Sequence, residues 1–210
     1  MDPFIKEIQQ IKTVEDAINK LKTETEITPK LNEIINFIIV AHEGQYRKSG
    51  EPYSVHPILV ACITAHFSKD EAIIATALLH DVVEDTPYTL EYVNETWGSD
   101  IAHMVDGLTK IVEIREHEFI SSNETTDAKI ISSALTFRKM LIASIDDVRV
   151  LVVKLCDRLH NMLTLSVLPP NKQKRIAEET LVVYVPIANR LGISHLKNAL
   201  EDLAFYYIYP

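Results

Sequence analysis

A dense group of ionisable side chains ends one apolar segment of the chain. His80 and Asp81 follow a run of Ala and Leu, and Glu84 and Asp85 come one helical turn later. At helical spacing, residues four apart share a face, so each residue of the first pair lies over one of the second. Three carboxylates then crowd a helix end where the dipole is already negative, which destabilises the helix unless a cation compensates. Because His beside Asp offers mixed nitrogen and oxygen ligands, the pattern predicts a bound metal ion.

Two other segments carry residues of the same kind. His56 stands before Pro57, at the expected start of a helix, where proline is well tolerated. Asp157, Asn161 and Thr164 have the spacing of one face of a helix that is apolar on most other faces. A buried carboxylate is costly unless it is paired or bound to a metal. Both segments are therefore candidates to complete the metal site.

In chain order, the candidates His56, His80-Asp81 and Asp157 resemble the metal-ligand signature of the HD phosphohydrolase superfamily. The flanking residues resemble the hydrolase domain of RelA/SpoT homologues, and the resemblance covers residues 40–210. The segments that carry it most clearly are RKSGEPYSVHP at 47–57, ALLHDVVEDT at 77–86, VDGLTK at 105–110 and KLCDRLHNM at 154–162.

The resemblance implies an all-α fold, a single HD-superfamily helical domain with a mononuclear metal site between facing helices. It implies a manganese-dependent enzyme that removes the 3′-pyrophosphate of the alarmones ppGpp and pppGpp and leaves GDP or GTP. The residues that match the family's functional positions are the metal ligands His56, His80, Asp81 and Asp157, the water-activating pair Glu84 and Asp85, and the substrate-contacting residues Arg47, Lys48, Ser49, Asn161 and Thr164.

Two positions depart from the family pattern. Cys156 stands where the family often has Ala, which is a conservative change. Leu163 stands where the family often has Arg, which removes a positive charge near the expected pocket mouth. Leu163 therefore raises a question about substrate affinity or the preference between alarmones, and not about the metal.

Composition narrows the possible classes of protein. The chain has 210 residues and a formal net charge of −9, which argues against a general DNA or RNA binder but allows one anionic ligand in a local basic pocket. Cys62 and Cys156 lie in apolar helical patterns and are expected to be buried thiols in a reducing compartment. The N-terminal residues do not resemble a signal peptide, and no apolar run is long enough to span a membrane. A cytoplasmic protein is the default expectation.

Hydrophobic periodicity predicts helices along most of the chain. Residues 4–24 form one helix or two short ones, because Thr13 and Asp16 resemble a capping box. Pro87 should end the helix that carries the acidic cluster near Asp85. The other predicted helices are 28–46, 55–67, 69–85, 88–97, 99–112, 128–145, 147–165, 171–190 and 194–208, with loops at 47–54 and 113–127.

Three parts are expected: an N-terminal helical segment (1–27) that packs on the domain, the hydrolase domain (28–190) and a C-terminal helix (191–210). The last resembles the connector to a synthetase domain, whose expected sequence is absent from these residues. A fragment of a bifunctional enzyme, which would also carry synthetase and regulatory domains, and a stand-alone hydrolase both remain open.

Other interpretations of the same residues also remain open. A different HD phosphohydrolase would act on another nucleotide, such as NADPH. A regulatory module would bind alarmone without turnover, although it would be expected to lack a ligand or the acidic pair. Arg47 and Lys48 also fit an ordinary solvated turn, and Asp157 fits a buried partner of an arginine. Among the remaining histidines, His160 is the strongest alternative ligand because it lies within the third motif.

Overall fold

The computed structural model describes residues 2–119 and 146–209, together with positions 134, 135, 137, 138, 140 and 142. Within this described part the regular structure is helical, and one isolated antiparallel bridge joins Tyr46 to Pro52. The predicted all-α fold is thereby confirmed. The elements are α1 (Pro3–Gln10), α2 (Val14–Glu24), α3 (Pro29–Ala41), α4 (Val55–Phe67), α5 (Glu71–Leu79), α6 (Val82–Asp85), α7 (Leu90–Trp97), α8 (Ser99–Phe119), α10 (Val148–Leu163), the 3₁₀ turn η1 (Leu165–Val167), α11 (Pro170–Glu179), the π-helical turn η2 (Thr180–Tyr184), α12 (Val185–Arg190) and α13 (Ser194–Ile208).

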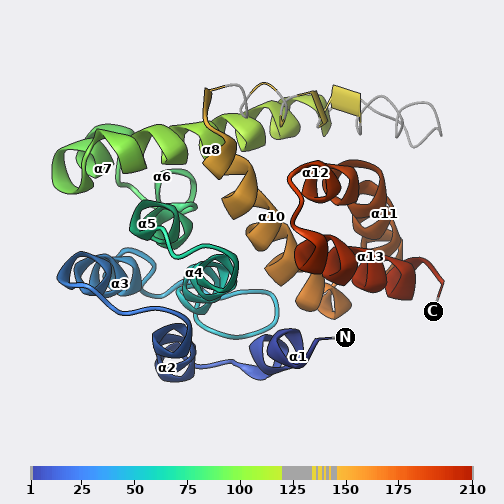
Figure 1. The fold of residues 1–210 in the computed structure, drawn as a ribbon, viewed down its shortest axis with the longest axis horizontal. Helices are drawn as coiled ribbons and strands as arrows, with labels where there is room; N and C mark the ends of the chain where they lie inside the picture. Colours follow the sequence, from blue (N-terminus) through green and yellow to red (C-terminus); the bar gives the residue numbers. More distant parts are fainter. Residues whose placement is uncertain are drawn as a thin grey trace.

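Helix α4 is the centre of the molecule. It packs against α2, α5 and α10, while α8 runs along one edge and α11 to α13 gather beyond α10 (Figure 1). Every residue from Val55 to Ala65 is buried. A helix that is apolar on all sides belongs in the middle of a core, and α5 shares this character. Two buried helices thus form a rigid platform for side chains at their ends.

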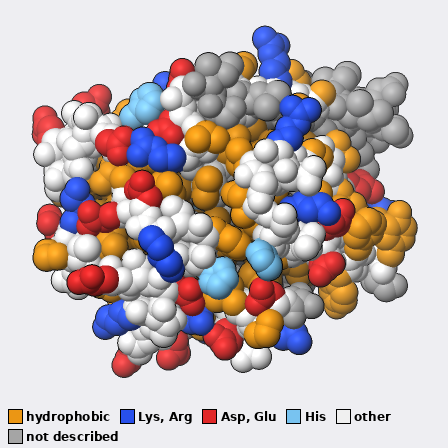
Figure 2. All heavy atoms as spheres, viewed as in Figure 1, with side chains coloured by type: hydrophobic (Ala, Val, Ile, Leu, Met, Phe, Trp, Pro, Cys, Tyr) orange, Lys and Arg blue, Asp and Glu red, His pale blue; other side chains and the backbone are white. Residues whose placement is uncertain are grey.

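The surface around this core carries charges of both signs. Figure 2 shows lysine, arginine and acidic side chains interspersed over one face, with hydrophobic side chains in the hollows between them. No helix in the part of the chain that the structure describes is both long enough and apolar enough to cross a membrane.

The first segment forms two helices, as the capping-box alternative predicted. The hydroxyl oxygen of Thr13 accepts a hydrogen bond from the backbone N–H of Asp16 at 3.1 Å and so caps α2. Thr28 caps α3 in the same way. The predicted end of α3 at residue 46 is wrong, because the helix ends at Ala41 and Gly44 then takes φ 78°, which a left-handed turn after a helix requires.

The predicted single helix over 69–85 is also wrong. The chain ends α5 at Leu79, turns at His80 and Asp81, and resumes as the short α6. The carbonyl of Ala77, which would accept the N–H of Asp81 in a continuous helix, accepts a hydrogen bond from His80 Nδ1 at 2.8 Å. The predicted end at Asp85 is correct, and Thr86 is extended as the residue before a proline should be.

Helix α8 is longer than predicted. It continues to Phe119, so the expected loop over 113–127 is wrong for 113–119, where glutamate and arginine favour a helix. Residues 120–127 and most of the predicted helix 128–145 lie outside the described residues. The predicted helix 171–190 divides into α11, η2 and α12, and the chain breaks at Gly192 (φ 73°) before α13, as predicted.

Candidate metal centre and active site

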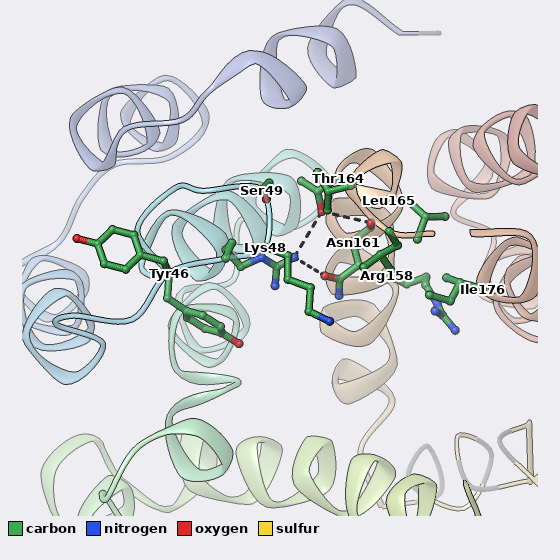
Figure 3. Close-up of a pocket in the computed structure, with 12 residues that line it drawn as sticks. Tyr46, Lys48, Ser49, Arg158, Asn161, Thr164, Leu165 and Ile176 are labelled. Carbon is green, nitrogen blue, oxygen red and sulfur yellow. Dashed lines mark hydrogen bonds between the residues drawn. The ribbon is translucent and has the colours of Figure 1, made fainter. Parts of the chain in front are cut away.

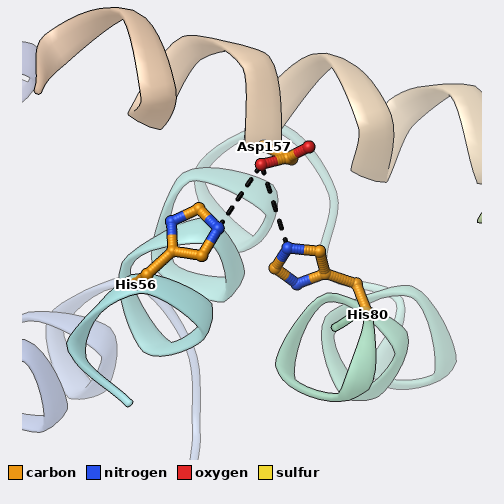
Figure 4. Close-up of side chains that lie close together, drawn as sticks. All are labelled: His56, His80 and Asp157. Carbon is orange, nitrogen blue, oxygen red and sulfur yellow. Dashed lines mark ion pairs between the residues drawn. The ribbon is translucent and has the colours of Figure 1, made fainter. Parts of the chain in front are cut away.

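Three helices bring a compact group of ligand atoms together. His56 comes from the first turn of α4, His80 from the end of α5 and Asp157 from the middle of α10. One ligand atom from each lies within 4.8 Å of the other two, and the side chains converge on one point (Figure 4). The three residues are 1%, 2% and 6% exposed, so the group is closed off from bulk water.

Asp81 joins this group from the turn between α5 and α6. Its Oδ1 lies 3.0 Å from His80 Nε2, and its Oδ2 lies 3.5 Å from His56 Nε2. Asp157 Oδ1 is 3.4 Å from His56 Nε2 and 3.8 Å from His80 Nε2. The structure therefore places all four predicted ligands around one small volume.

The two imidazoles are oriented by contacts on their far sides. His80 Nδ1 donates to the carbonyl of Ala77, which turns Nε2 toward the carboxylates. His80 Nε2 is buried, and Asp81 Oδ1 lies 3.0 Å from it. His56 Nδ1 is 2.8 Å from Nδ1 of His160, which is also buried. Burial, together with the neighbouring His56, lowers the pKa of His160 well below its usual range.

The ionisable groups of this cluster strongly shift one another's pKa values. Burial lowers the pKa of His80, but the carboxylates of Asp81 and Asp157 outweigh this effect and raise it to about 9. Burial alone would raise the pKa of the Asp81 and Asp157 carboxyl groups. Instead, both pKa values lie well below the ordinary range, because His80 is close to Asp81 and Lys154 is close to Asp157. Two carboxylates therefore share a pocket with two imidazoles and the ammonium group of Lys154. The imidazole and carboxylate donors fit a divalent metal ion, which would take the place of the proton on His80 Nε2.

Lys154 is a buried partner of Asp157 that the sequence reasoning missed. Its Nζ donates to Asp157 Oδ2 at 2.9 Å, while the amide of Asn161 donates to Oδ1 at 2.5 Å. Arg158 does not pair with Asp157, because its guanidinium group binds Glu179 and lies 3.9 Å from the ring centroid of Tyr184. The i, i+3 spacing of the lysine was the signal that could have revealed the pair.

The acidic pair lies at the open end of the cluster, on α6. Glu84 and Asp85 are both exposed. Partial desolvation raises the pKa of Glu84 to about 7. The charge of Lys154 opposes this rise, and the charge of Asp81 adds to it. Asp85 Oδ2 accepts a hydrogen bond from the hydroxyl of Tyr53 at 2.6 Å. Burial, Asp81 and Asp85 raise the pKa of that phenol, so it keeps its proton.

A cavity of about 420 Å³ opens beside this group (Figure 3). The loop before α4 and the C-terminal half of α10 form its opposite sides. All five residues predicted to contact substrate line it: Arg47, Lys48, Ser49, Asn161 and Thr164.

The predicted residues contact one another across the cavity. Arg47 Nη2 donates to Asn161 Oδ1 at 2.7 Å and to Thr164 Oγ1 at 3.4 Å. The hydroxyl of Ser49 is held by Glu51 Oε1 at 2.7 Å, which positions the loop. The guanidinium group of Arg47 and the ammonium group of Lys48 line the cavity, so it suits an anionic ligand.

The rest of the cavity wall was not found from the sequence. Its apolar part comes from η1 and the residues after it, and apolar side chains there look like any other core positions. The additional wall residues are Tyr46, Tyr53, Arg158, Leu165, Val167, Leu168 and Ile176. The expectation that Leu163 lies near the pocket mouth is wrong, because this side chain is 2% exposed and lies outside the wall.

The cysteines are buried thiols, as predicted. Burial raises the pKa of both Cys62 and Cys156 to about 12, so neither supplies a thiolate ligand at neutral pH. The metal cluster is built from imidazole and carboxylate groups instead.

These features define a class of protein: a helical domain with a buried cluster of His and Asp side chains that could hold a metal ion, beside a basic cavity. The family model described as "HD domain" matches residues 35–194, and the chain belongs to this family. The resemblance to the hydrolase domain of RelA/SpoT homologues is likewise confirmed by the relatives that the chain matches.

Curated relatives and a solved structure support this placement. The chain is 52% identical over 80% of its length to a Myxococcus xanthus protein named GTP pyrophosphokinase. It is 48% identical over 81% of its length to a Haemophilus influenzae guanosine-3′,5′-bis(diphosphate) 3′-pyrophosphohydrolase, and 46% identical over 81% to the Escherichia coli bifunctional (p)ppGpp synthase/hydrolase SpoT. It spans only 21%, 24% and 23% of these three relatives, respectively.

The solved structure is described as a metazoan ortholog of SpoT that hydrolyses ppGpp. It has a TM-score of 0.62 and 26% identity, and the match covers 87% of this chain and 97% of that one. The names of the curated relatives include both a kinase and hydrolases, and the matched part is about a quarter of each. The chemistry of the site must therefore decide which activity this segment carries.

Proposed function

We propose that this chain hydrolyses the 3′-pyrophosphate of ppGpp and pppGpp, giving GDP or GTP and pyrophosphate. The observation that carries the proposal is the junction of two sites at Asn161. Its side-chain Nδ2 donates a hydrogen bond to Asp157 of the His/Asp cluster, and its side-chain Oδ1 accepts one from Arg47 of the basic cavity. A substrate held in this cavity would present a phosphate to the metal cluster. The names of relatives in the matched region support the same substrate.

The cavity has separate means to hold the two parts of such a substrate. Arg47 and Lys48 neutralise phosphate oxygens, and the planar guanidinium group can also stack on a purine. Asn161 and Thr164 offer hydrogen bonds from α10, and Ser49 offers one from the loop. The apolar wall that includes Leu165 and Ile176 excludes water from one side of the bound base.

We assign His56, His80, Asp81 and Asp157 as ligands of the divalent ion, and propose Mn²⁺. The nitrogen and oxygen donors suit this ion better than a thiolate site would, and the convergence of buried ligand atoms from three helices supports the assignment. When bound, the ion supplies Lewis-acid polarisation of a phosphoryl oxygen. Lys154 keeps Asp157 ionised and turns its Oδ1 toward the imidazoles.

The acidic pair then acts on the attacking water. The water oxygen attacks the phosphorus that carries the ribose 3′-oxygen, and the bond between that phosphorus and the 3′-oxygen breaks. The 3′-oxygen leaves on GDP or GTP and takes up a proton, which balances the proton that the water loses, and pyrophosphate keeps the oxygen of the water. Glu84, with a pKa raised to about 7, accepts the proton that the water loses. Asp85 orients the same water from the next position on α6.

The arrangement of the parent protein is also a proposal. Residues 1–27 form an N-terminal helical segment, 28–190 the hydrolase domain, and 191–210 a connector that leads toward synthetase and regulatory domains. The small fraction of each curated relative that the chain spans supports the presence of further domains in the parent protein. The cytoplasmic location and the lack of DNA binding stay predictions from composition.

One assay tests the proposed reaction. The purified chain is incubated with ppGpp and Mn²⁺, and the products are separated by anion-exchange chromatography. We expect equal amounts of GDP and pyrophosphate, and no product in the presence of a chelator. Asp81→Ala should lose both Mn²⁺ binding and turnover, whereas Asp100→Ala, an exposed acid at the far end of α8, should behave as the parent. Release of orthophosphate would contradict the proposal.

A further inference from the structure

We propose that Tyr53 is a positioning residue whose hydroxyl group links the metal cluster to the water-activating pair. The phenol oxygen lies 2.7 Å from Asp81 Oδ2 and 2.6 Å from Asp85 Oδ2. Asp81 is an assigned ligand and Asp85 an assigned water-orienting group, so the inference rests on the proposed function for these two roles. Among the residues that the structure describes, Tyr53 is the side chain that hydrogen-bonds to both carboxylates.

The bridge can hold two anions close together because of the chemistry of a phenol. The hydroxyl group has one proton to donate and can give it to one carboxylate at a time. A hydrogen bond to an ionised acceptor is short and strong, and both carboxylate oxygens lie close enough to accept it. The phenol therefore ties each carboxylate in turn and resists the repulsion that would push Asp85 away from Asp81.

The ring of Tyr53 is fixed in place from several directions. It stacks on His42, with 4.7 Å between ring centroids and 24° between planes. The guanidinium group of Arg47 lies 5.8 Å from the ring centroid on the cavity side. The backbone N–H of Tyr53 donates to the carbonyl of Gln45 at 2.9 Å. A donor that is packed in this way can hold a carboxylate within the narrow range that catalysis needs.

Gln45 strengthens the same connection through the main chain. Its Nε2 donates to the backbone carbonyl of Asp85 at 2.8 Å, and its Oε1 accepts a hydrogen bond from His42 Nδ1 at 2.8 Å. The loop before α4 therefore contacts Asp85 at two points: Tyr53 hydrogen-bonds to its side chain, and Gln45 hydrogen-bonds to its backbone carbonyl. Asp85 ends the four-residue helix α6 and is exposed, so little else restrains it.

Loss of the hydroxyl group should affect turnover and metal binding more than substrate binding. Without it, Asp85 can turn into solvent, and Asp81 loses a partner on the oxygen nearest His56. Removal of such a supporting partner typically lowers metal affinity or activity by about 10–100-fold. The cavity contacts of Arg47 with Asn161 do not involve the phenol and should persist.

Tyr53→Phe tests this inference, because it keeps the ring and removes only the hydroxyl group. We expect kcat for ppGpp and Mn²⁺ affinity, measured by electron paramagnetic resonance titration, each to fall about 10–100-fold. KM should change less than about 2-fold, because the variant keeps the ring that lines the cavity and the contact of Arg47 with Asn161. Tyr209→Phe is the matched control: Tyr209 follows α13 outside the cavity wall, is 74% exposed, and should retain parent values.

A double-mutant cycle with Asp85→Asn separates positioning from general damage. If Tyr53 acts through Asp85, Tyr53→Phe should reduce kcat much less in the Asp85→Asn background than in the parent. Parent values of kcat and Mn²⁺ affinity in Tyr53→Phe, a rise in KM alone, or full additivity in the cycle would each overturn the inference. If the parent chain fails to hydrolyse ppGpp, the proposed function fails, but the comparison of Mn²⁺ affinities still decides the role of Tyr53.

Discussion

The amide group of Asn161 donates a hydrogen bond to Asp157 Oδ1 over 2.5 Å, and the two residues are one helical turn apart on α10. The same side chain accepts a hydrogen bond from Arg47 at 2.7 Å. One residue therefore connects a buried metal cluster to the wall of a basic cavity. Because Asp157 and Asn161 share one face of α10, the proposed function would use this position to set a bound phosphate relative to an ion held by Asp157.

Asn161→Ala should weaken this connection without removing an assigned ligand. A hydrogen bond to a charged partner contributes about 1.5–3 kcal/mol, so we expect kcat/KM for ppGpp to fall about 10–100-fold. Mn²⁺ should still bind, because both imidazoles and both carboxylates remain. Steady-state kinetics and Mn²⁺ titration check both points, with Asn19→Ala on α2 as a control. Parent kinetics in Asn161→Ala would argue against the role of the junction.

His160 should act on the ion through His56. The two Nδ1 atoms are 2.8 Å apart, so a neutral His160 can accept the Nδ1–H of His56 and leave its Nε2 free for a metal. His160→Phe keeps a ring but removes the acceptor, and we expect Mn²⁺ affinity to fall about 10–100-fold. His195→Phe changes an exposed histidine and provides the control. Unchanged Mn²⁺ affinity in His160→Phe would show that the contact does not orient the ligand.

Glu84 should set the lower limb of the pH–rate profile. A general base works when it is deprotonated, so activity should rise with pH through the pKa of this group. Its pKa is raised to about 7, and a bound cation nearby lowers it, so the limb should lie at or below pH 7. Glu84→Gln should retain Mn²⁺ but lose most turnover, and its residual rate should lack that limb. An unchanged profile in Glu84→Gln would remove Glu84 from the role of base.

Gly107 on α8 should be needed for the close approach of α8 to α10. A Cβ atom at this position would lie 2.9 Å from Val150 Cγ2, and Val150 is buried and β-branched, so it yields little. Overpacking typically costs about 1–3 kcal/mol, which exceeds the gain of up to about 1 kcal/mol from replacing a helical glycine with alanine.

Urea unfolding provides the measurement for this contact. Gly107→Ala should lower the free energy of unfolding in the parent, whereas in a Val150→Ala background it should be neutral or stabilising. If Gly107→Ala alone raised the free energy of unfolding, the gain in helix propensity would outweigh the clash with Val150. The packing of α8 on α10 would then have room for a methyl group.

The site residues could be predicted because short segments of the chain resemble the hydrolase domain of RelA/SpoT homologues. Spacing alone supports part of this prediction: Asp157 and Asn161 are one helical turn apart on α10, so they share a face. The helix starts at Thr13 and Thr28 could also be predicted, because their caps depend on hydrogen bonds within three residues.

The rest depends on contacts between segments that are distant in sequence. Tyr53 lies beside Asp81 and Asp85 only after the loop before α4 has folded against α6. The interruption of the helix at His80 was missed, because periodicity cannot show that a side chain replaces a backbone donor at Ala77. The apolar wall of the cavity gives no signal that distinguishes it from the core.

Hydrolysis of ppGpp in water enriched in oxygen-18 tests the central claim most directly. If water attacks the phosphorus that carries the ribose 3′-oxygen, the heavy isotope must appear in pyrophosphate, and GDP must contain none. Mass spectrometry of the separated products measures both. Labelled orthophosphate would instead show attack at the terminal phosphorus, and label in GDP would show cleavage on the ribose side of the bridging oxygen. Either result would contradict the account.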